Sequence, residues 1–133
     1  MNQCFRLLVI ILGTAIALSG CAALSGVPEG SVLVGVYEGS FTGKFFWGTI
    51  QVKVYETPGS LLRQVSGWIE QEAEPGSYLN FQGALKGSRF EGQFTVVNGN
   101  ISGELSSDGG LVTGVYNFTD WPFDHGTWNA RKK

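Results

Sequence analysis

FWGTIQVKV, residues 46–54, alternates apolar and polar side chains and decides the fold. Phe46, Ile50, Val52 and Val54 fall on one face together with Gly48, while the polar residues between them fall on the other. Side chains two positions apart share a face of a β-strand, so this pattern predicts a strand with one buried face. The same alternation recurs at 79–85, 90–96 and 101–105, and no stretch beyond residue 20 has apolar residues at helical spacing.

Turn signals separate the alternating runs at regular intervals. They are rich in glycine, proline, serine and asparagine, and Asn98-Gly99 suits the two left-handed positions of a type I′ hairpin. Seven such turns, at 39–43, 57–60, 74–77, 86–88, 98–99, 107–110 and 119–124, separate eight predicted strands. We expect these strands at about 32–38, 44–56, 61–72, 78–85, 89–97, 100–106, 111–118 and 125–131. Tight turns between neighbours predict an up-and-down antiparallel meander.

Nearly every predicted strand contains a glycine two positions before a large apolar residue. The pairs are Gly35/Tyr37, Gly48/Ile50, Gly67/Ile69, Gly83/Leu85, Gly92/Phe94, Gly103/Leu105, Gly114/Tyr116 and Gly126/Trp128. Glycine weakens a strand unless a bend or close approach requires it, so the repeat indicates a strongly coiled sheet that closes on itself. The sequence therefore predicts an all-β fold, a single antiparallel β-barrel of about eight strands. We expect Tyr37, Phe81, Phe94, Tyr116 and Trp128 inside it, and Glu38, Lys53, Glu91 and Glu104 outside. An eight-stranded barrel is either filled by side chains or holds one small ligand.

The first twenty residues have the organisation of an export signal. Arg6 precedes an uncharged apolar run, residues 7–18, which is shorter than the ~20 residues of a membrane-spanning helix. Leu18-Ser19-Gly20-Cys21 resembles the lipobox of bacterial lipoproteins, an aliphatic residue and two small ones before a cysteine. The resemblance implies cleavage between Gly20 and Cys21 and lipid attachment to the Cys21 thiol. An uncleaved helix over 7–24 and a Cys4–Cys21 disulfide are the alternatives, although Cys4 lies in the segment that would be removed.

The lipobox also implies a location and a division of the chain. In that family the residue after the cysteine influences sorting, and Ala22 favours the outer membrane facing the periplasm, with the cell surface as an alternative. We expect a removed signal at 1–20, a lipidated cysteine and flexible tether at 21–31, and the barrel at 32–133. No cysteine follows Cys21, which excludes a disulfide scaffold or zinc cluster in the barrel. Without Arg6 the chain has 8 basic and 11 acidic side chains. It has no basic patch with interleaved aromatic residues apart from the terminal Arg131-Lys132-Lys133, so we expect no nucleic-acid partner.

A second resemblance concerns the barrel. Gly126-Thr127-Trp128 is similar to the Gly-x-Trp signature of the avidin and lipocalin families of small eight-stranded barrels. In those families the signature lies on the first strand, whereas here it lies on the last predicted strand. The resemblance therefore implies a candidate architecture and no binding residues.

One segment gathers most of the chemically versatile side chains. Residues 119–128 contain the single histidine, His125, near Asp120 and Asp124, which would serve acid–base chemistry or begin a metal site. Catalysis also needs a nucleophile or positioned water, and a metal needs three or four converging ligands, so an exposed strand start is the simpler interpretation. Glu70, Glu72 and Glu74 share a predicted face and are interpreted as a solvated strand end. We expect no metal and no cofactor.

The tryptophans are candidates for contact with a ligand or partner. Trp47 and Trp68 fall on the polar face of their predicted strands, so exposure would mark a contact surface; Trp121, His125 and Trp128 complete the candidate set. The sequence thus favours a membrane-anchored, non-enzymatic binding module for a small apolar ligand or an envelope protein. The alternatives are a structural or inhibitory envelope protein with a filled barrel that acts through its surface, and an enzyme centred on His125, Asp120 and Asp124.

Overall fold

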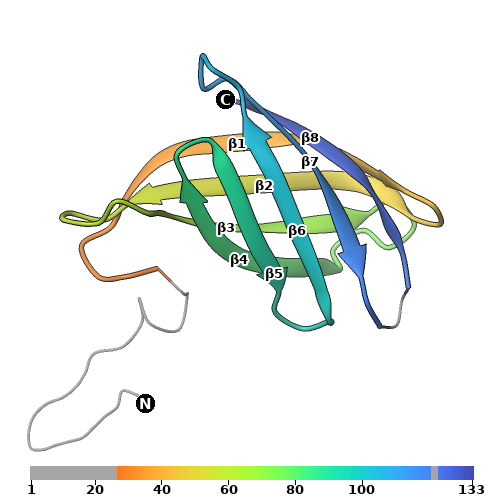
Figure 1. The fold of residues 1–133 in the computed structure, drawn as a ribbon. Coiled ribbons are helices and arrows are strands. Elements are labelled where there is room, and N and C mark those ends of the chain that lie inside the picture. The colour runs from red at the N-terminus through yellow and green to blue at the C-terminus, as the bar shows by residue number, and fades with distance from the viewer. Residues whose placement is uncertain (1–26, 121–122) are drawn as a thin grey trace, which may run out of the picture. The chain divides into compact units, whose positions relative to one another are not determined.

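Eight antiparallel strands form a closed barrel in the part of the chain that the structure, a computed structural model, describes, residues 27–120 and 123–133 (Figure 1). Each strand pairs with its neighbours in sequence, and β8 pairs with β1 to close the sheet. The strands are β1 Val32–Gly43, β2 Trp47–Glu56, β3 Arg63–Gln71, β4 Tyr78–Lys86, β5 Arg89–Phe94, β6 Gly99–Leu105, β7 Leu111–Phe118 and β8 His125–Lys132. The predicted all-β, up-and-down barrel is confirmed, and the architecture is consistent with a lipocalin- or avidin-like fold.

The largest difference from the predicted strands lies in β1. The turn expected at 39–43 is wrong, because β1 continues to Gly43 and pairs with both β2 and β8 along that stretch. Gly39 permits the close approach of β1 and β8, because a Cβ there would collide with the carbonyl oxygen of Asn129 on β8. The hairpin lies instead at residues 44–46, which had been assigned to the start of the second strand.

The turn expected at Asn98-Gly99 is also different. A type I′ turn needs positive φ at both central residues, and neither Asn98 nor Gly99 has it. Strand β5 ends early, at Phe94, and a four-residue connection over 95–98 precedes β6. Two backbone hydrogen bonds attach this connection to neighbouring segments. Thr95 donates its N–H to the carbonyl of Asn80 on β4, and the Asn98 carbonyl accepts the N–H of Thr119.

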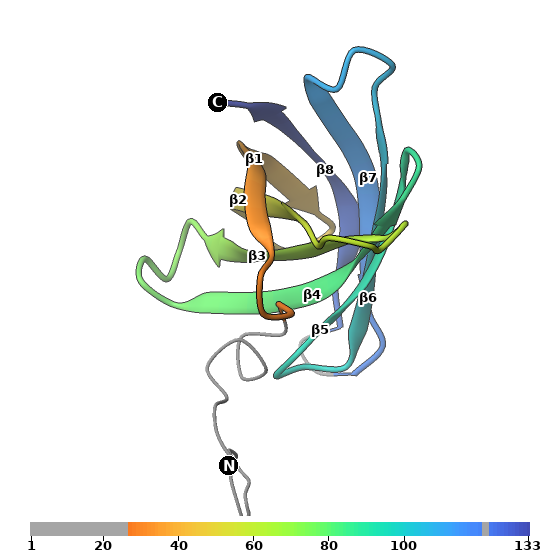
Figure 2. The ribbon, with the colours of Figure 1, turned by 90° about the vertical axis from the view of Figure 1, so that its left-hand side faces the viewer.

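The strands are strongly tilted and coiled. Figures 1 and 2 show β5, β6 and β7 crossing the opposite wall, formed by β1, β2 and β3, at a steep angle. Such coiling brings neighbouring backbones together on the concave side, where a Cβ does not fit. Gly114 faces Gly103 across β6 and β7, and a Cβ on Gly114 would lie 2.7 Å from the Gly103 Cα. The repeated glycines therefore permit the barrel to close, as their pattern predicted.

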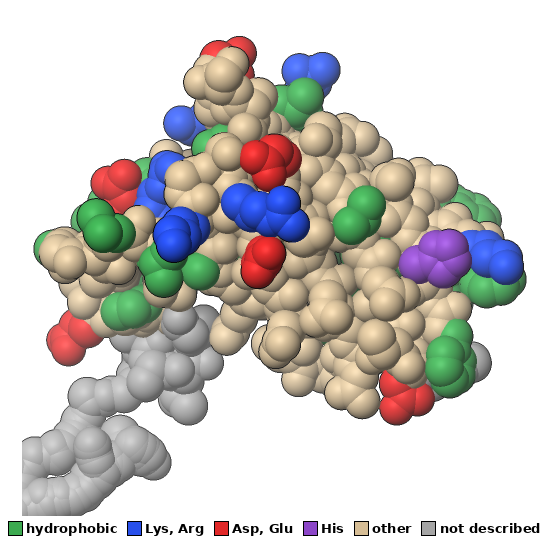
Figure 3. Space-filling model, viewed as in Figure 1, with side chains coloured by type: hydrophobic (Ala, Val, Ile, Leu, Met, Phe, Trp, Pro, Cys, Tyr) green, Lys and Arg blue, Asp and Glu red, His purple; other side chains and the backbone are tan. Residues whose placement is uncertain are grey.

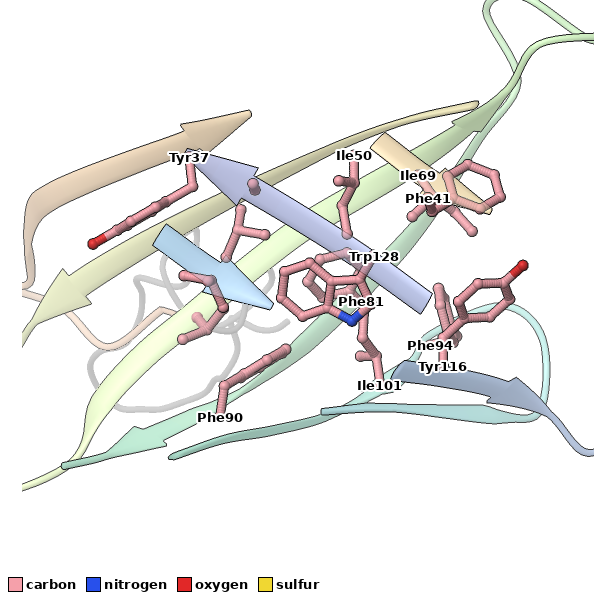
Figure 4. Close-up of a cluster of buried hydrophobic side chains, with 14 of the residues drawn as sticks. Tyr37, Phe41, Ile50, Ile69, Phe81, Phe90, Phe94, Ile101, Tyr116 and Trp128 are labelled. Atoms are coloured by element: carbon pink, nitrogen blue, oxygen red, sulfur yellow. The ribbon is translucent and has the colours of Figure 1, made fainter. Parts of the chain in front are cut away.

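Aromatic rings fill the interior along the length of the barrel. Successive ring centroids lie 4.8–6.2 Å apart in a series that links Phe41, Tyr116, Phe118, Phe94, Phe81, Phe90 and Trp128. Figure 4 shows Trp128 near the middle of this cluster, with Tyr37 and Tyr116 at opposite ends. The five residues predicted inside are all buried. Aromatic pairs at these separations contribute about 0.5–1.5 kcal/mol each beyond their buried area, so these ring contacts stabilise the barrel.

The outward positions are mostly polar. Glu38, Glu91 and Glu104 are exposed and Lys53 is partly exposed, as predicted. Among the described residues, no helix is long and apolar enough to cross a membrane.

Candidate functional site

The up-and-down topology divides the loops between two ends of the barrel. We call one the entry end, because β1 begins there at Val32; it also carries the connections at 57–62, 87–88 and 106–110 and the end of β8. We call the other the aromatic end; it carries the connections at 44–46, 72–77, 95–98 and 119–124. His125, at the start of β8, lies at the aromatic end.

A buried carboxylate organises the aromatic end. Asp124 shares the parity of Gly126, Trp128 and Ala130 on β8, so its side chain points into the barrel. It is 1% exposed, and it is the one polar or charged side chain in the described ranges that is fully buried. Its Oδ2 accepts a hydrogen bond from the Tyr116 hydroxyl at 2.6 Å, and its Oδ1 accepts one from the Phe45 backbone N–H at 2.9 Å. Both carboxylate oxygens therefore have donors, which a buried charge requires.

The Tyr116 phenol is adapted to this environment. Burial raises the pKa of Tyr116, and the hydrogen bond to Asp124 and its negative charge raise it further. The phenol therefore stays protonated and remains a hydrogen-bond donor to the carboxylate. A Cβ on Gly43 would collide with both side chains, so the pair is tightly enclosed where β1, β7 and β8 meet. We call the Asp124 side chain with its bonds to Tyr116 and Phe45 the Asp124 latch.

The latch fixes two loops relative to each other. Besides the side-chain bond to Phe45, the carbonyl of His125 accepts the N–H of Lys44, and the carbonyl of Asp124 accepts the N–H of Phe118. Phe123, just before Asp124, has φ of 52°, and it is the one non-glycine residue with positive φ in the described part of the chain. This conformation is uncommon for a bulky residue and persists where the surrounding bonds determine it. Here the latch on one side and the bond from the Phe123 N–H to the Asp120 carbonyl on the other supply those bonds.

Three exposed aromatic side chains lie at this end, Phe45 and Phe123 in the two loops that the latch joins and Trp47 at the start of β2. Phe45 and Trp47 are each 58% exposed and Phe123 is 59% exposed; we call these three the aromatic rim. The Lys44 ammonium lies 5.4 Å from the centroid of the Phe45 ring. Figure 3 shows the histidine, a Lys or Arg side chain and hydrophobic side chains close together at the right of the molecule. Exposed aromatic residues beside cations are typical of protein–protein contact surfaces.

The three residues of the catalytic alternative have different surroundings. His125 is exposed on β8 whereas Asp124 points into the barrel, as adjacent strand residues must. Asp120 is exposed, and its carboxylate accepts a bond from the Asn98 side-chain amide at 3.4 Å. A catalytic or metal site built on all three requires their convergence, and the inward position of Asp124 prevents it. Within residues 27–120 and 123–133, no group of three His, Cys, Asp or Glu side chains is placed to hold a metal ion.

The tryptophans predicted to contact a ligand or partner differ in how exposed they are. Trp47 is exposed in the aromatic rim. Trp68 is half-buried on the outer face of β3 and packs against Tyr78 of β4, with ring centroids 4.8 Å apart. Trp128 is buried, and its indole N–H donates to the Ser102 and Val115 carbonyls. Trp128 therefore belongs to the core, and a surface partner does not reach it. Trp121, Gly20 and Cys21 lie outside the described residues.

The three glutamates near β3 do not share one role. Glu70 lies on the strand and accepts the Gly76 backbone N–H at 2.6 Å, which caps the loop between β3 and β4. Glu72 and Glu74 follow the strand and are exposed in that loop. Their arrangement matches the predicted solvated strand end.

Sequence reasoning missed the latch and the Phe123 conformation. The alternation of β8, continued back from Trp128 through Gly126, would have placed Asp124 inside. The Phe45 N–H and the Tyr116 hydroxyl, its partners, depend on strand register, which the sequence does not show.

No protein-family model matches the sequence, and no curated protein matches it.

Proposed function

We propose that this chain is a membrane-anchored envelope lipoprotein whose filled barrel acts as a non-enzymatic binding module, with the aromatic rim as the contact surface for a protein partner. The observation that carries the binding role is the rim itself: three exposed aromatic side chains at one end of the barrel, two of them in the loops that a fully buried carboxylate joins. The lipobox at Leu18-Ser19-Gly20-Cys21 supports the anchor, on the outer membrane facing the periplasm.

The interior supports a surface role over an internal ligand. A small apolar ligand would need the space between the walls, and there the rings of Phe81, Phe90 and Trp128 contact one another. Displacing them would cost packing that stabilises the barrel. The outer surface, by contrast, offers apolar area that solvent now covers. Aromatic side chains dominate binding energy at protein interfaces, so Phe45, Trp47 and Phe123 are the expected anchors.

Site-specific photo-crosslinking tests the binding role. A photoreactive residue is placed at position 45 or 123, with position 61 at the entry end as the matched exposed control. We expect one common adduct from positions 45 and 123 in intact cells and a different pattern from position 61. A Trp47→Ser substitution should reduce the common adduct. Adducts that are absent from 45 and 123, or identical at all three positions, would refute the assignment of the rim.

Acyl labelling tests the anchor. The Cys21→Ser variant should incorporate no fatty acid and should accumulate as an uncut precursor. Normal processing and membrane retention of this variant would contradict the anchor while leaving the crosslinking result unaffected.

A further inference from the structure

The entry end carries a second group of exposed apolar side chains. Val32, Leu33 and Val34 begin β1, and Leu61 and Leu62 end the loop between β2 and β3; all five are exposed, Leu61 to 98%. Val32 pairs with Glu56 on one side of the end of β2, and Gln64 pairs with Tyr55 on the other side, so the two segments flank the end of β2. Figure 3 shows hydrophobic side chains gathered at the left of the molecule, on the side where the described chain begins. We call these five residues the entry patch.

Cations lie beside the entry patch at the mouth of the barrel. Arg63 and Lys132 occupy inward-facing positions at the ends of β3 and β8, where the interior opens to solvent. The Arg63 guanidinium donates to the Gly87 carbonyl at 3.4 Å, which places it next to the hairpin that carries exposed Lys86. The Lys132 Cε lies 3.6 Å from where a Cβ on Gly35 would be, so this side chain lies along β1.

Five carboxylates lie at this end, and most of them have partners: Glu91 pairs with Arg89, and Glu104 accepts the Ser88 hydroxyl beside the hairpin that carries Lys86. Asp108 accepts bonds from the Ser106 hydroxyl and the Gly110 N–H of its own turn, and Glu38 is bonded to Lys133. Glu56 is exposed beside the patch.

Because the cations and carboxylates of the entry end are nearly equal in number, the aromatic end is the more acidic of the two. Glu70, Glu72, Glu74 and Asp120 lie there, and Lys44 is the lysine or arginine that opposes them among the described residues. The two ends of the barrel therefore suit different surfaces.

We infer that the entry end is a membrane-contact surface for anionic phospholipid. The entry patch enters the headgroup region, and Arg63, Lys86 and Lys132 contact lipid phosphates. Apolar side chains flanked by basic residues bind anionic membranes through buried apolar area and electrostatic attraction together. The inference rests on the proposed lipid anchor for its orientation, although the contact itself does not require the lipid.

The length of the tether supports this occupant. Eleven residues, 21–31, separate the predicted lipid attachment from β1. A flexible chain of that length has an end-to-end distance of about 18 Å, so the entry end stays close to the bilayer. At such a short distance the effective concentration of membrane surface is high. The entry end of the anchored protein therefore contacts the lipid headgroups even if its affinity is too weak to recruit a free protein to the membrane.

Vesicle binding by a chain that begins at Ala22 tests the inference without the lipid. The buried core lies entirely within β1 to β8, so this chain keeps every residue that packs in the barrel. We expect cosedimentation with phosphatidylglycerol vesicles, much weaker binding to phosphatidylcholine vesicles, and loss of the difference at high salt.

Substitutions at the two ends locate the contact. The double variant Leu61→Ser, Leu62→Ser should lower binding to phosphatidylglycerol vesicles about tenfold or more, because both side chains would otherwise be buried on binding. Lys86→Gln should lower it about fivefold. Phe45→Ser and Phe123→Ser, at comparably exposed positions of the aromatic end, are the matched controls and should leave it unchanged.

Several results would overturn the inference. These are equal binding to both vesicle types, no binding to either, or an equal loss in the Phe45→Ser control. Concentration-dependent self-association abolished by the Leu61 and Leu62 substitutions, without vesicle binding, would assign the patch to a second copy instead. The outcome is separable from the anchor: acyl labelling of Cys21 with no vesicle binding refutes only this inference, and vesicle binding with no labelling refutes only the anchor.

Discussion

Replacing Asp124 with alanine tests whether the latch holds the aromatic end. The substitution leaves the Tyr116 hydroxyl and the Phe45 N–H without their acceptor in the barrel. A hydrogen bond to a charged group contributes about 1.5–3 kcal/mol, and two are lost. Part of this is recovered, because the carboxylate no longer pays its desolvation penalty. We therefore expect Asp124→Ala to lower the free energy of unfolding by about 3 kcal/mol.

Asp124→Asn is the matched control. The asparagine keeps the shape of the side chain, its carbonyl oxygen can accept the Phe45 N–H, and its amide can donate to the Tyr116 oxygen, since a hydroxyl is both donor and acceptor. Both groups keep a hydrogen bond and only the Tyr116 O–H proton loses its acceptor, so the loss should be smaller, about 1 kcal/mol. Urea unfolding followed by tryptophan fluorescence measures both values, because Trp128 is buried in the core.

A double-mutant cycle measures the coupling free energy between Tyr116 and Asp124. Tyr116→Phe alone leaves the buried carboxylate with one donor fewer, and adding Asp124→Ala removes that unpaired charge. The double variant should therefore be more stable than the sum of the two single losses by about 1.5 kcal/mol or more. Additive losses, or equal losses for Asp124→Ala and Asp124→Asn, would show that the bond between Tyr116 and Asp124 does not stabilise the barrel.

Two further predictions follow from the same geometry. Because the pKa of Tyr116 is raised above its ordinary value of 10.0, the unfolded chain releases this proton near pH 10 while the folded chain retains it; stability should fall as pH rises above 10. Tyr116→Phe should flatten that fall in urea unfolding at successive pH values, and an unchanged slope would contradict the raised pKa. Gly114→Ala should cost about 3 kcal/mol or prevent folding, because its Cβ would collide with the Ser102 carbonyl on β6. Gly110→Ala, whose Cβ would meet a side-chain oxygen of Asp108 at 3.4 Å, should be tolerated, and urea unfolding of both variants measures the difference.

The strands were predictable because alternation records burial directly. Each inward-facing large residue of β2, β7 and β8 could be assigned from parity alone, and Tyr116 and Trp128 are buried as expected. The glycine repeat was also informative, since a barrel of this coil leaves no room for a Cβ where Gly103 and Gly114 face each other. The local sequence thus predicts which residues of a strand face inward and where neighbouring strands approach closely.

The errors arose where one residue type serves two purposes. Glycine marks both turns and close strand contacts, so Gly39 was assigned to a turn although it lies against Asn129 of β8. Asn98-Gly99 has the composition of a tight hairpin, but the 95–98 connection is longer and is bonded to β4 and to the loop before β8. Both outcomes depend on strands distant in sequence. The Asp124 latch was not predicted for the same reason, because its two donors lie 79 and 8 residues away in the sequence.

An even number of strands in an up-and-down barrel has a consequence for orientation. Because each strand reverses direction, β1 begins and β8 ends at the same end, and the register places Arg131 and Lys132 opposite Glu38 and Tyr37 of β1 in the entry half of the barrel. The proposed anchor upstream of β1 would draw that end, with its apolar and basic side chains, toward the membrane. The aromatic end would then point away from the membrane, where the proposed partner could reach it. At that end the Asp124 carboxylate and the backbone bond from Lys44 to His125 join the loops from which Phe45 and Phe123 project.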